Sequence, residues 1–311
     1  MSVLRLAVHR LLYGVAVLWL VSTLVFAFLH LSPVPAERVI GGPRATAGTL
    51  RLIRADLGLD DPVPVQYGRF LARLASGDLG DSHAGGEPVA ALIAERLPTT
   101  LWLVLGAAVL WFAGGVALGV LGATRARGAA DRVTTVLVLA GLSTPPFVLA
   151  LVLLSVLGTG AALFEAGPPM QEHFLRRMTL PWLALAVLMV ATYARLTRSA
   201  MLDVLGEDYV RTARAKGLSR RRVVYRHGLR AALTPVVTQF GVDLGALAGS
   251  TVVIEKVFGL QGVGQLVHHA ITLGDTPVIM GVTLLTTLAV IVANLLVDVA
   301  YAALDPRVRP A

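Results

Sequence analysis

Residues 97–124 read LPTTLWLVLGAAVLWFAGGVALGVLGAT, without a single Asp, Glu, Lys or Arg. The hydrocarbon core of a bilayer is about 30 Å thick, and a helix needs roughly 20 apolar residues to cross it. This stretch is longer than that and predicts a membrane-spanning helix. Further stretches carry the same signal, one of them interrupted by a single aspartate: residues 11–31, 133–164, 178–194, 231–254 and 276–297.

The composition fits a membrane protein. Hydrophobic residues make up 56% of the 311-residue chain and charged residues only 15%. Soluble domains are about 45–50% apolar and about 25% charged, and disordered chains are more polar still. We therefore expect an all-α integral membrane protein with six transmembrane helices. The chain has no cysteine, which excludes disulfides, thiolate metal sites and cysteine nucleophiles.

The distribution of lysine and arginine predicts the orientation. The net charge is +8, and most basic residues of the short loops lie on one side, above all between Arg195 and Arg230. Cytoplasmic loops carry such an excess, so both termini are expected inside the cell membrane, N-in and C-in. Nucleic-acid binding is not expected, because the arginines follow the loops and form no basic domain. The first span is longer than the apolar core of a signal peptide and is expected to be retained.

Residues 32–97 form an external segment between the first two spans. Apolar side chains recur there at helical spacing in three places: residues 50–57, followed by the stop residue Gly58, residues 67–74, and residues 89–97 as a short helix leading into the second span. Two interpretations stay open. The segment is either a passive cap over the spans or a docking surface for an external protein.

A long basic loop follows the fourth span, over residues 203–235. Gly217 is predicted to end its first helix and Ser219 to cap the next one. The apolar face of the first helix consists of Val210, Ala213, Gly217 and Leu218. One interpretation is a topogenic loop lying on anionic lipid. Lipid-binding helices usually carry large apolar residues, however, and small ones such as Ala213 and Ala215 favour docking into a cleft of a cytoplasmic partner.

The stretch YVRTARAKGLS, residues 209–219, resembles the EAA loop of binding-protein-dependent ABC importers in its peptide-importer form. The general pattern is Glu-Ala-Ala, three residues, then Gly. Aligned on Gly217, it puts Arg211 at the Glu position, Thr212 at the first Ala and Ala213 at the second. The acidic residue is missing, so a salt bridge assigned to it does not carry over. The resemblance implies an ATPase-coupling loop made of Tyr209, Arg211, Thr212, Ala213, Ala215, Lys216, Gly217, Leu218 and Ser219.

Other stretches agree with this resemblance, in order along nearly the whole chain: GDLGDS at 77–82, LPTTL at 97–101, GS and VIEKVF within 249–258, GVG at 262–264 after Gln261 in place of the usual Pro, NLLVD at 294–298 and YAALDPR at 301–307. The set resembles the B-type permease subunit of a dipeptide/oligopeptide ABC importer. It implies a type I ABC importer permease fold. The implied domains are residues 1–96, a helix plus the external segment, residues 97–302, the permease domain, and residues 303–311, a cytoplasmic tail.

The resemblance also implies partners: a second, C-type permease subunit, two ATP-binding subunits and an external solute-binding protein. This chain has no phosphate-binding loop, because Lys216 is followed by Gly217 and Lys256 by Val257. We therefore expect ATP and Mg on the partner subunits and no enzyme activity in this chain. Peptide cargo would cross by alternating access, driven through residues 208–222.

Ionisable residues inside a span are functional candidates. Asp243 lies in the middle of the fifth span, where it either lines the path and meets a peptide amino terminus or pairs with a polar neighbour or a partner arginine. Ser250 and Glu255 are further candidates for the path or a gate. For Glu255, contact with the binding protein and a solvated helix end are alternatives. Asp298, near the inner end of the sixth span, is expected to snorkel or to pair with an arginine.

Two other classes of protein stay open. One is a self-sufficient ion-coupled carrier with proton sites at Asp243 and Asp298. The other is a membrane scaffold whose basic loop recruits a partner without transport. Among importers, nickel, glutathione and haem-type cargo are alternatives to peptides. No metal site is expected at His268 and His269, which point to different faces of a helix without a close acidic residue.

Overall fold

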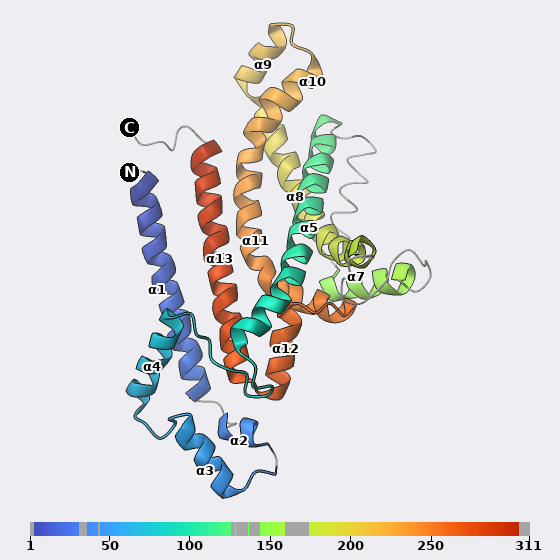
Figure 1. Ribbon diagram of the computed structural model, residues 1–311. Helices are drawn as coiled ribbons and strands as arrows, with labels where there is room; N and C mark the ends of the chain where they lie inside the picture. The colour runs from blue at the N-terminus through green and yellow to red at the C-terminus, as the bar shows by residue number, and fades with distance from the viewer. Residues whose placement is uncertain are drawn as a thin grey trace. The chain divides into compact units, whose positions relative to one another are not determined.

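The structure is a computed structural model and describes residues 3–30, 36–42, 44–125, 128, 136, 144–158 and 174–304. Within these ranges the regular elements are helices (Figure 1), and one isolated β-bridge joins Asp81 and Pro88. Two of the helices, η1 and η3, are π-helical. The elements are α1 (Val3–His30), α2 (Ala36–Gly41), α3 (Ala47–Asp56), α4 (Val63–Ala75), α5 (Val89–Thr124), α7 (Pro146–Leu153), η1 (Leu154–Gly158), α8 (Phe174–Gly206), α9 (Asp208–Ala215), α10 (Arg220–Arg222), η3 (Val223–Leu229), α11 (Arg230–Phe258), α12 (Val263–Leu273) and α13 (Thr276–Leu304).

In the described part of the chain, four helices are long and apolar enough to cross a bilayer: α1 over Arg10–Phe28, α5, α8 and α13 over Thr276–Leu296. At the fifth predicted span, α11 has 29 residues and is about 43 Å long at 1.5 Å per residue. Half of the third predicted span lies outside the described residues. In its described part α7 begins at Pro146, directly after Pro145, and neither proline can donate a backbone hydrogen bond to a helix. Four spans are thus confirmed as candidates, and the total of six stays a prediction.

The short helix expected over residues 89–97 is not a separate element. It forms the first turns of α5, which begins at Val89 and continues through Pro98. Val89 and Ile93 are buried against Val278 of α13. This packing keeps the chain helical through a residue that cannot donate to the helix ladder.

The fourth predicted span is also too short. It ends at residue 194 in the prediction, whereas α8 continues to Gly206. The extension carries Arg195 and Arg198, and arginine is a good helix former, so the loss of apolar character does not end the helix.

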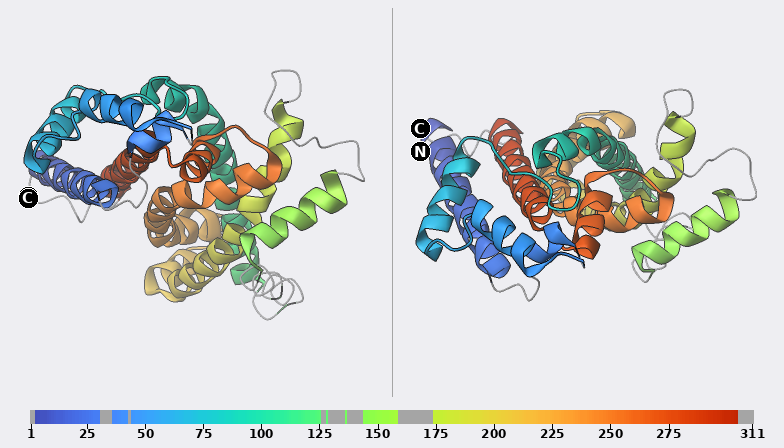
Figure 2. Two further views of the ribbon diagram at one scale, coloured as in Figure 1. Left: turned by 90° about the horizontal axis from the view of Figure 1, so that it is seen from below. Right: turned by 60° about the horizontal axis from the view of Figure 1, so that its bottom comes forward.

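The chain divides into two compact units. Unit 1 comprises Met1–Ala7, Leu101–Leu260 and Val292–Ala311, and unit 2 comprises Val8–Thr100 and Gln261–Ile291. In unit 1, α8 and α11 lie side by side (Figure 1), and α7, light green in Figure 2, packs against both.

Small residues allow the helices of unit 1 to approach closely. A Cβ on Gly119 of α5 would lie 2.8 Å from the carbonyl oxygen of Ala194 in α8. Aromatic side chains fill the core nearby: the rings of Trp111 and Tyr193 lie 5.6 Å and 6.3 Å from the ring of Phe240 in α11. The core therefore fixes α5, α8 and α11 against one another.

In unit 2, the helices predicted over residues 50–57 and 67–74 are confirmed as α3 and α4. Gly58 follows α3 with a φ of 61°, the left-handed conformation typical of the residue after a helix. The hydroxyls of Tyr67 in α4 and Thr23 in α1 are 2.6 Å apart. The external helix α4 is thus tied to the first span.

Candidate functional site

Backbone hydrogen bonds hold the turn after α9 in a defined shape. The amide of Gly217 donates to the carbonyl of Arg214 at 3.0 Å, and the amide of Leu218 donates to that of Ala213 at 3.4 Å. Gly217 has a φ of 78°. This pair of bonds is the Schellman motif, which needs a left-handed residue and therefore favours glycine. The predicted helix end at Gly217 is confirmed.

The two faces of α9 differ in exposure. Val210 and Ala213 are buried against Val223 of η3, with Leu218 packed on the same cluster. Most of the other residues assigned to the loop are exposed: Tyr209, Arg211, Thr212, Ala215, Lys216, Gly217 and Ser219. The argument from small residues assumed that Ala213 presents its side chain to a partner. The side chain is instead buried within the loop. Its small size serves packing within the loop.

Ser219 occupies the N-cap position of α10, but its side chain makes no capping hydrogen bond. The predicted cap is therefore right in position and wrong in mechanism. Arg220 supplies a different attachment, because its guanidinium donates to the carbonyl of Thr124, the last residue of α5, at 2.8 Å. A cation at a helix C-terminus also interacts favourably with the helix dipole. The loop is thus fixed to the end of a neighbouring span.

The loop is also continuous with the fifth predicted span. From Arg220 the chain is helical without a break through α10, η3 and α11 to Phe258. The π-helical turn lies at the joint and contains Gly228, which is buried; a Cβ there would lie 3.2 Å from Leu205 of α8. Single π-helical turns often mark functional sites. No pattern in the sequence indicates this π-helical segment.

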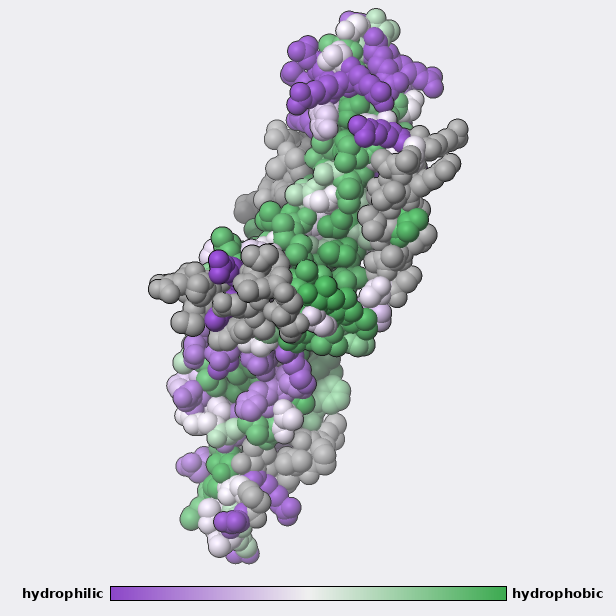
Figure 3. All heavy atoms as spheres, turned by 90° about the vertical axis from the view of Figure 1, so that its right-hand side faces the viewer, coloured by the Kyte–Doolittle hydropathy of each residue, from purple (hydrophilic) through white to green (hydrophobic). Residues whose placement is uncertain are grey.

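Basic residues and exposed polar groups make the surface of α9 and α10 hydrophilic, as seen at the top of Figure 3, while the helices next to it present hydrophobic surface. On α9 itself Arg211 lies 3.5 Å from Asp208, a pair that is exposed and contributes little stability. An exposed basic surface on a rigid turn suits a protein partner outside the bilayer.

Asp243 lies in the middle of α11, in contact with α8. Its carboxylate accepts a hydrogen bond from the Tyr193 hydroxyl at 2.8 Å and another from the Gln239 amide at 3.0 Å. Pairing with polar neighbours, one of the two predicted roles, is therefore present. The residue is only half-buried.

The other candidate residues in the predicted spans have environments different from that of Asp243. Glu255 is fully buried, with 0% of its surface exposed, so the alternative of a solvated helix end is wrong. Backbone bonds after it, with Leu260 donating to the Glu255 carbonyl at 2.8 Å, end α11 at Gly259. The side chains of Ser250 and Asp298 lie outside the described residues.

A buried cluster in unit 2 was not predicted. Asp275, between α12 and α13, accepts hydrogen bonds from the Ser82 hydroxyl at 2.5 Å and from the amides of His83 and Ala84 at 3.1 Å and 3.3 Å. Burial lowers the pKa of His83, against the opposing effect of the Asp275 charge. Ser82 belongs to the GDLGDS motif, so this motif has a structural role. Its hydrogen bonds to Asp275 hold the external segment to the start of the last predicted span.

Several apolar helices of spanning length, together with a basic loop that continues into α11, are the features of an integral membrane protein. Residues 115–310 match the family described as binding-protein-dependent transport system inner membrane component, and residues 3–104 match its N-terminal family. The chain belongs to this family. It is a multi-pass membrane permease of the ABC importer class.

Relatives and solved structures agree with this assignment. The chain is 40% identical over 307 residues to the glutathione transport system permease protein GsiC of Escherichia coli (strain K12), covering 98% of this chain and 99% of that protein, and equally to GsiC of Salmonella typhi. The fold matches an amino acid ABC transporter solved with histidines, with a TM-score of 0.54, 15% identity and 69% and 94% coverage. It also matches the inward-facing MetNI methionine ABC transporter, with a TM-score of 0.56, 20% identity and 69% and 96% coverage.

Proposed function

We propose that this chain is the permease subunit of an ATP-driven importer of short peptides, with tripeptides of the glutathione type as the first cargo to test. The cargo proposal is supported by the relatives, which are named for glutathione transport at 40% identity over nearly the full chain. The peptide-importer form of residues 209–219 is consistent with it. Related cargo such as longer peptides would use the same path.

The observation that carries the mechanism is the unbroken helix from the loop into the membrane. An ATPase subunit binds the exposed face of α9, formed by Tyr209, Thr212, Ala215 and Lys216. Its ATP-driven movement shifts α9, and the buried contacts of Val210 pass this shift to η3. Because η3 continues into α11, the displacement reaches the helix that carries Asp243.

The complex in this proposal contains this chain, a second permease subunit, two ATP-binding subunits and an external binding protein. The two permeases enclose the translocation path. ATP and Mg are bound by the ATPase subunits, since this chain lacks a phosphate-binding loop. The external binding protein delivers the cargo, and alternating access moves it across.

Co-purification and transport test the proposal together. The tagged chain is purified from its native membrane in mild detergent, and the recovered subunits are reconstituted in liposomes with the external binding protein. We expect a second permease and an ATPase to co-purify, and uptake of glutathione or tri-alanine that requires ATP. Recovery of the chain alone, with uptake driven by a proton gradient, would instead support an ion-coupled carrier.

A further inference from the structure

A polar groove lies on unit 1 between α8 and α11. Its cavity of about 330 Å³ is lined by Thr192, Arg195, Leu196 and Ser199 from α8 and by Gln239 from α11. The four α8 residues follow one another at intervals of three or four or are adjacent, so they share one face of the helix. Three of the four are polar, in a helix that is otherwise apolar enough to cross a bilayer.

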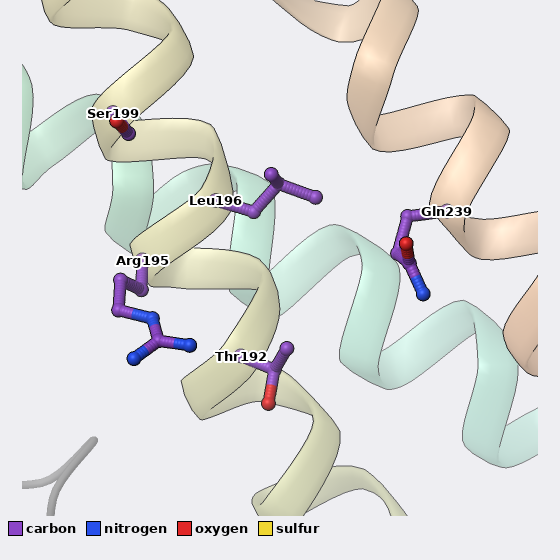
Figure 4. A pocket seen from close by; sticks show the side chains of 5 residues that line it. All are labelled: Thr192, Arg195, Leu196, Ser199 and Gln239. Carbon is purple, nitrogen blue, oxygen red and sulfur yellow. The ribbon is translucent and has the colours of Figure 1, made fainter.

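The two ends of this groove carry opposite chemistry. Gln239, which lines one side, donates its amide to Asp243. Asp243 receives hydrogen bonds from neutral groups only, so within the described chain its negative charge is not balanced by a cation. Arg195, on the other side, is exposed and forms no ion pair with a described residue. In Figure 4 the side chain of Leu196 points from α8 toward Gln239 of α11, whereas the side chain of Arg195 lies on the other side of the α8 ribbon.

A position facing lipid would be unfavourable for such a groove. Charged side chains inside membrane segments are costly and face a water-filled path or a protein partner. Guanidinium binds carboxylate with two parallel hydrogen bonds, and hydroxyls such as those of Thr192 and Ser199 add further donors. A carboxylate with two bound neutral donors retains lone pairs for an ammonium group.

We propose that the groove is a transport subsite for a short zwitterionic peptide, in which Arg195 binds the carboxylate end and Asp243, held by Gln239 and Tyr193, binds the ammonium end. This inference rests on the proposed import of peptides and adds the residues that recognise the two charged ends. Thr192 and Ser199 donate to the carboxylate. Leu196 contacts the peptide between its ends. Cargo without a free carboxylate loses the Arg195 contact.

The subsite is tested by a double-mutant type of cycle, in which the Arg195 side chain and the carboxylate of the peptide are changed singly and together. Uptake of tri-alanine and of tri-alanine amide is measured in reconstituted liposomes at saturating external binding protein, for the natural chain and for Arg195→Gln. The ratio of the two effects isolates the contact between Arg195 and the carboxylate, because the preference of the binding protein cancels. We expect Arg195→Gln to raise the KM for tri-alanine roughly 10-fold or more relative to the amide, as for loss of a charged hydrogen bond. Arg195→Lys retains the charge but not the two parallel donors of the guanidinium, and it should restore part of the affinity.

Arg198→Gln is the matched control. It removes the same charge one turn further along α8, from a residue that does not line the groove, and should change the uptake of both peptides equally. If the binding protein does not deliver the amide, the same cycle is measured by displacement of bound tri-alanine from the purified complex without binding protein. Equal effects of Arg195→Gln on both peptides would overturn the subsite while leaving peptide import intact. Failure of the natural chain to transport tri-alanine or glutathione would instead overturn the proposed function and the subsite with it.

Discussion

Two carboxylates of this protein, one in each unit, are held in opposite ways. Asp275 is 3% exposed and accepts bonds from a hydroxyl and two backbone amides. Asp243 is half-buried and accepts bonds only from the side chains of Tyr193 and Gln239. Backbone donors cannot move away from their acceptor without unfolding, whereas side-chain donors can rotate.

The difference separates a fixed structural group from one that can exchange partners. At Asp275 the hydrogen-bonding capacity is used to hold a turn of the external segment. Asp243 is held by Gln239, which lines the groove between α8 and α11. Burial of an acidic residue inside a membrane protein therefore does not by itself indicate a transport role, and the nature of the donors decides between the two interpretations.

The largest effect is expected from Asp275→Ala. The substitution removes the acceptor of three buried or partly buried donors, and each buried donor left without a partner costs about 1–3 kcal/mol. We expect a loss of several kcal/mol in stability, seen as a lower melting temperature of the detergent-purified protein and faster proteolysis near Ser82. An unchanged melting temperature would mean that the hydrogen bonds of Asp275 do not stabilise the fold and that the two carboxylates do not differ as argued.

The next effect concerns the loop over residues 208–222, which in the proposed mechanism moves the helix that carries Asp243. Gly217→Leu places a side chain on a left-handed residue, which costs about 1–2 kcal/mol, and alters the face that binds the ATPase. We expect ATP hydrolysis to continue while uptake falls about 10-fold. Gly206→Leu, at a glycine with open space around it and no positive φ, is the control. Normal coupling in Gly217→Leu would exclude docking through this turn.

A smaller effect is expected at Asp243 itself. Asp243→Ala should lower peptide uptake severalfold while the protein still assembles with its partners, because its hydrogen-bonding neighbours are side chains that can find other partners. Asp243→Asn keeps an acceptor for Gln239 and removes only the charge, so uptake should fall similarly if the charge binds cargo. Loss of assembly in Asp243→Ala, with no separate uptake defect, would place it with Asp275 as a structural group.

The smallest effect is a pH dependence of stability that arises at the contacts between Asp275 and residues 82–84. Burial lowers the pKa of His83 in the folded protein, so the unfolded chain binds more protons as the pH falls through the ordinary pKa of histidine. Stability is therefore complete above that pKa and decreases below it. The melting temperature should drop slightly between pH 7.5 and pH 5, and His83→Gln should reduce this drop. An equal drop in the variant would assign the pH dependence to other groups.

Much of the fold could be predicted from the sequence because its determinants are local. Long apolar stretches predict spans, and Gly217 and Gly58 end helices through their own conformational freedom. Helix ends within continuous packing were less predictable. Residues 89–97 were predicted as a separate short helix, but the burial of Val89 and Ile93 keeps α5 helical through Pro98.

The site was predictable only in part. The residues of the loop over 209–219 follow from its motif, but their exposure does not: Ala213 packs inward, whereas Ala215 is exposed. The contacts of Asp275 join residues that are far apart in sequence, and no local pattern indicates them. Arg195 counted as part of the cytoplasmic loop in the sequence, because its place on a groove depends on how α8 packs against α11.

The most direct test of the central claim is a cross-link from the exposed face of α9. The chain has no cysteine, so Ala215→Cys introduces a thiol that is unique within it. Treatment of the transport-active complex with a thiol-to-amine cross-linker should join Ala215→Cys to an ATPase subunit, while Ala213→Cys, buried in the loop, should not react. An active complex in which Ala215→Cys is labelled by a thiol reagent but forms no cross-link to an ATPase subunit would contradict coupling through this loop.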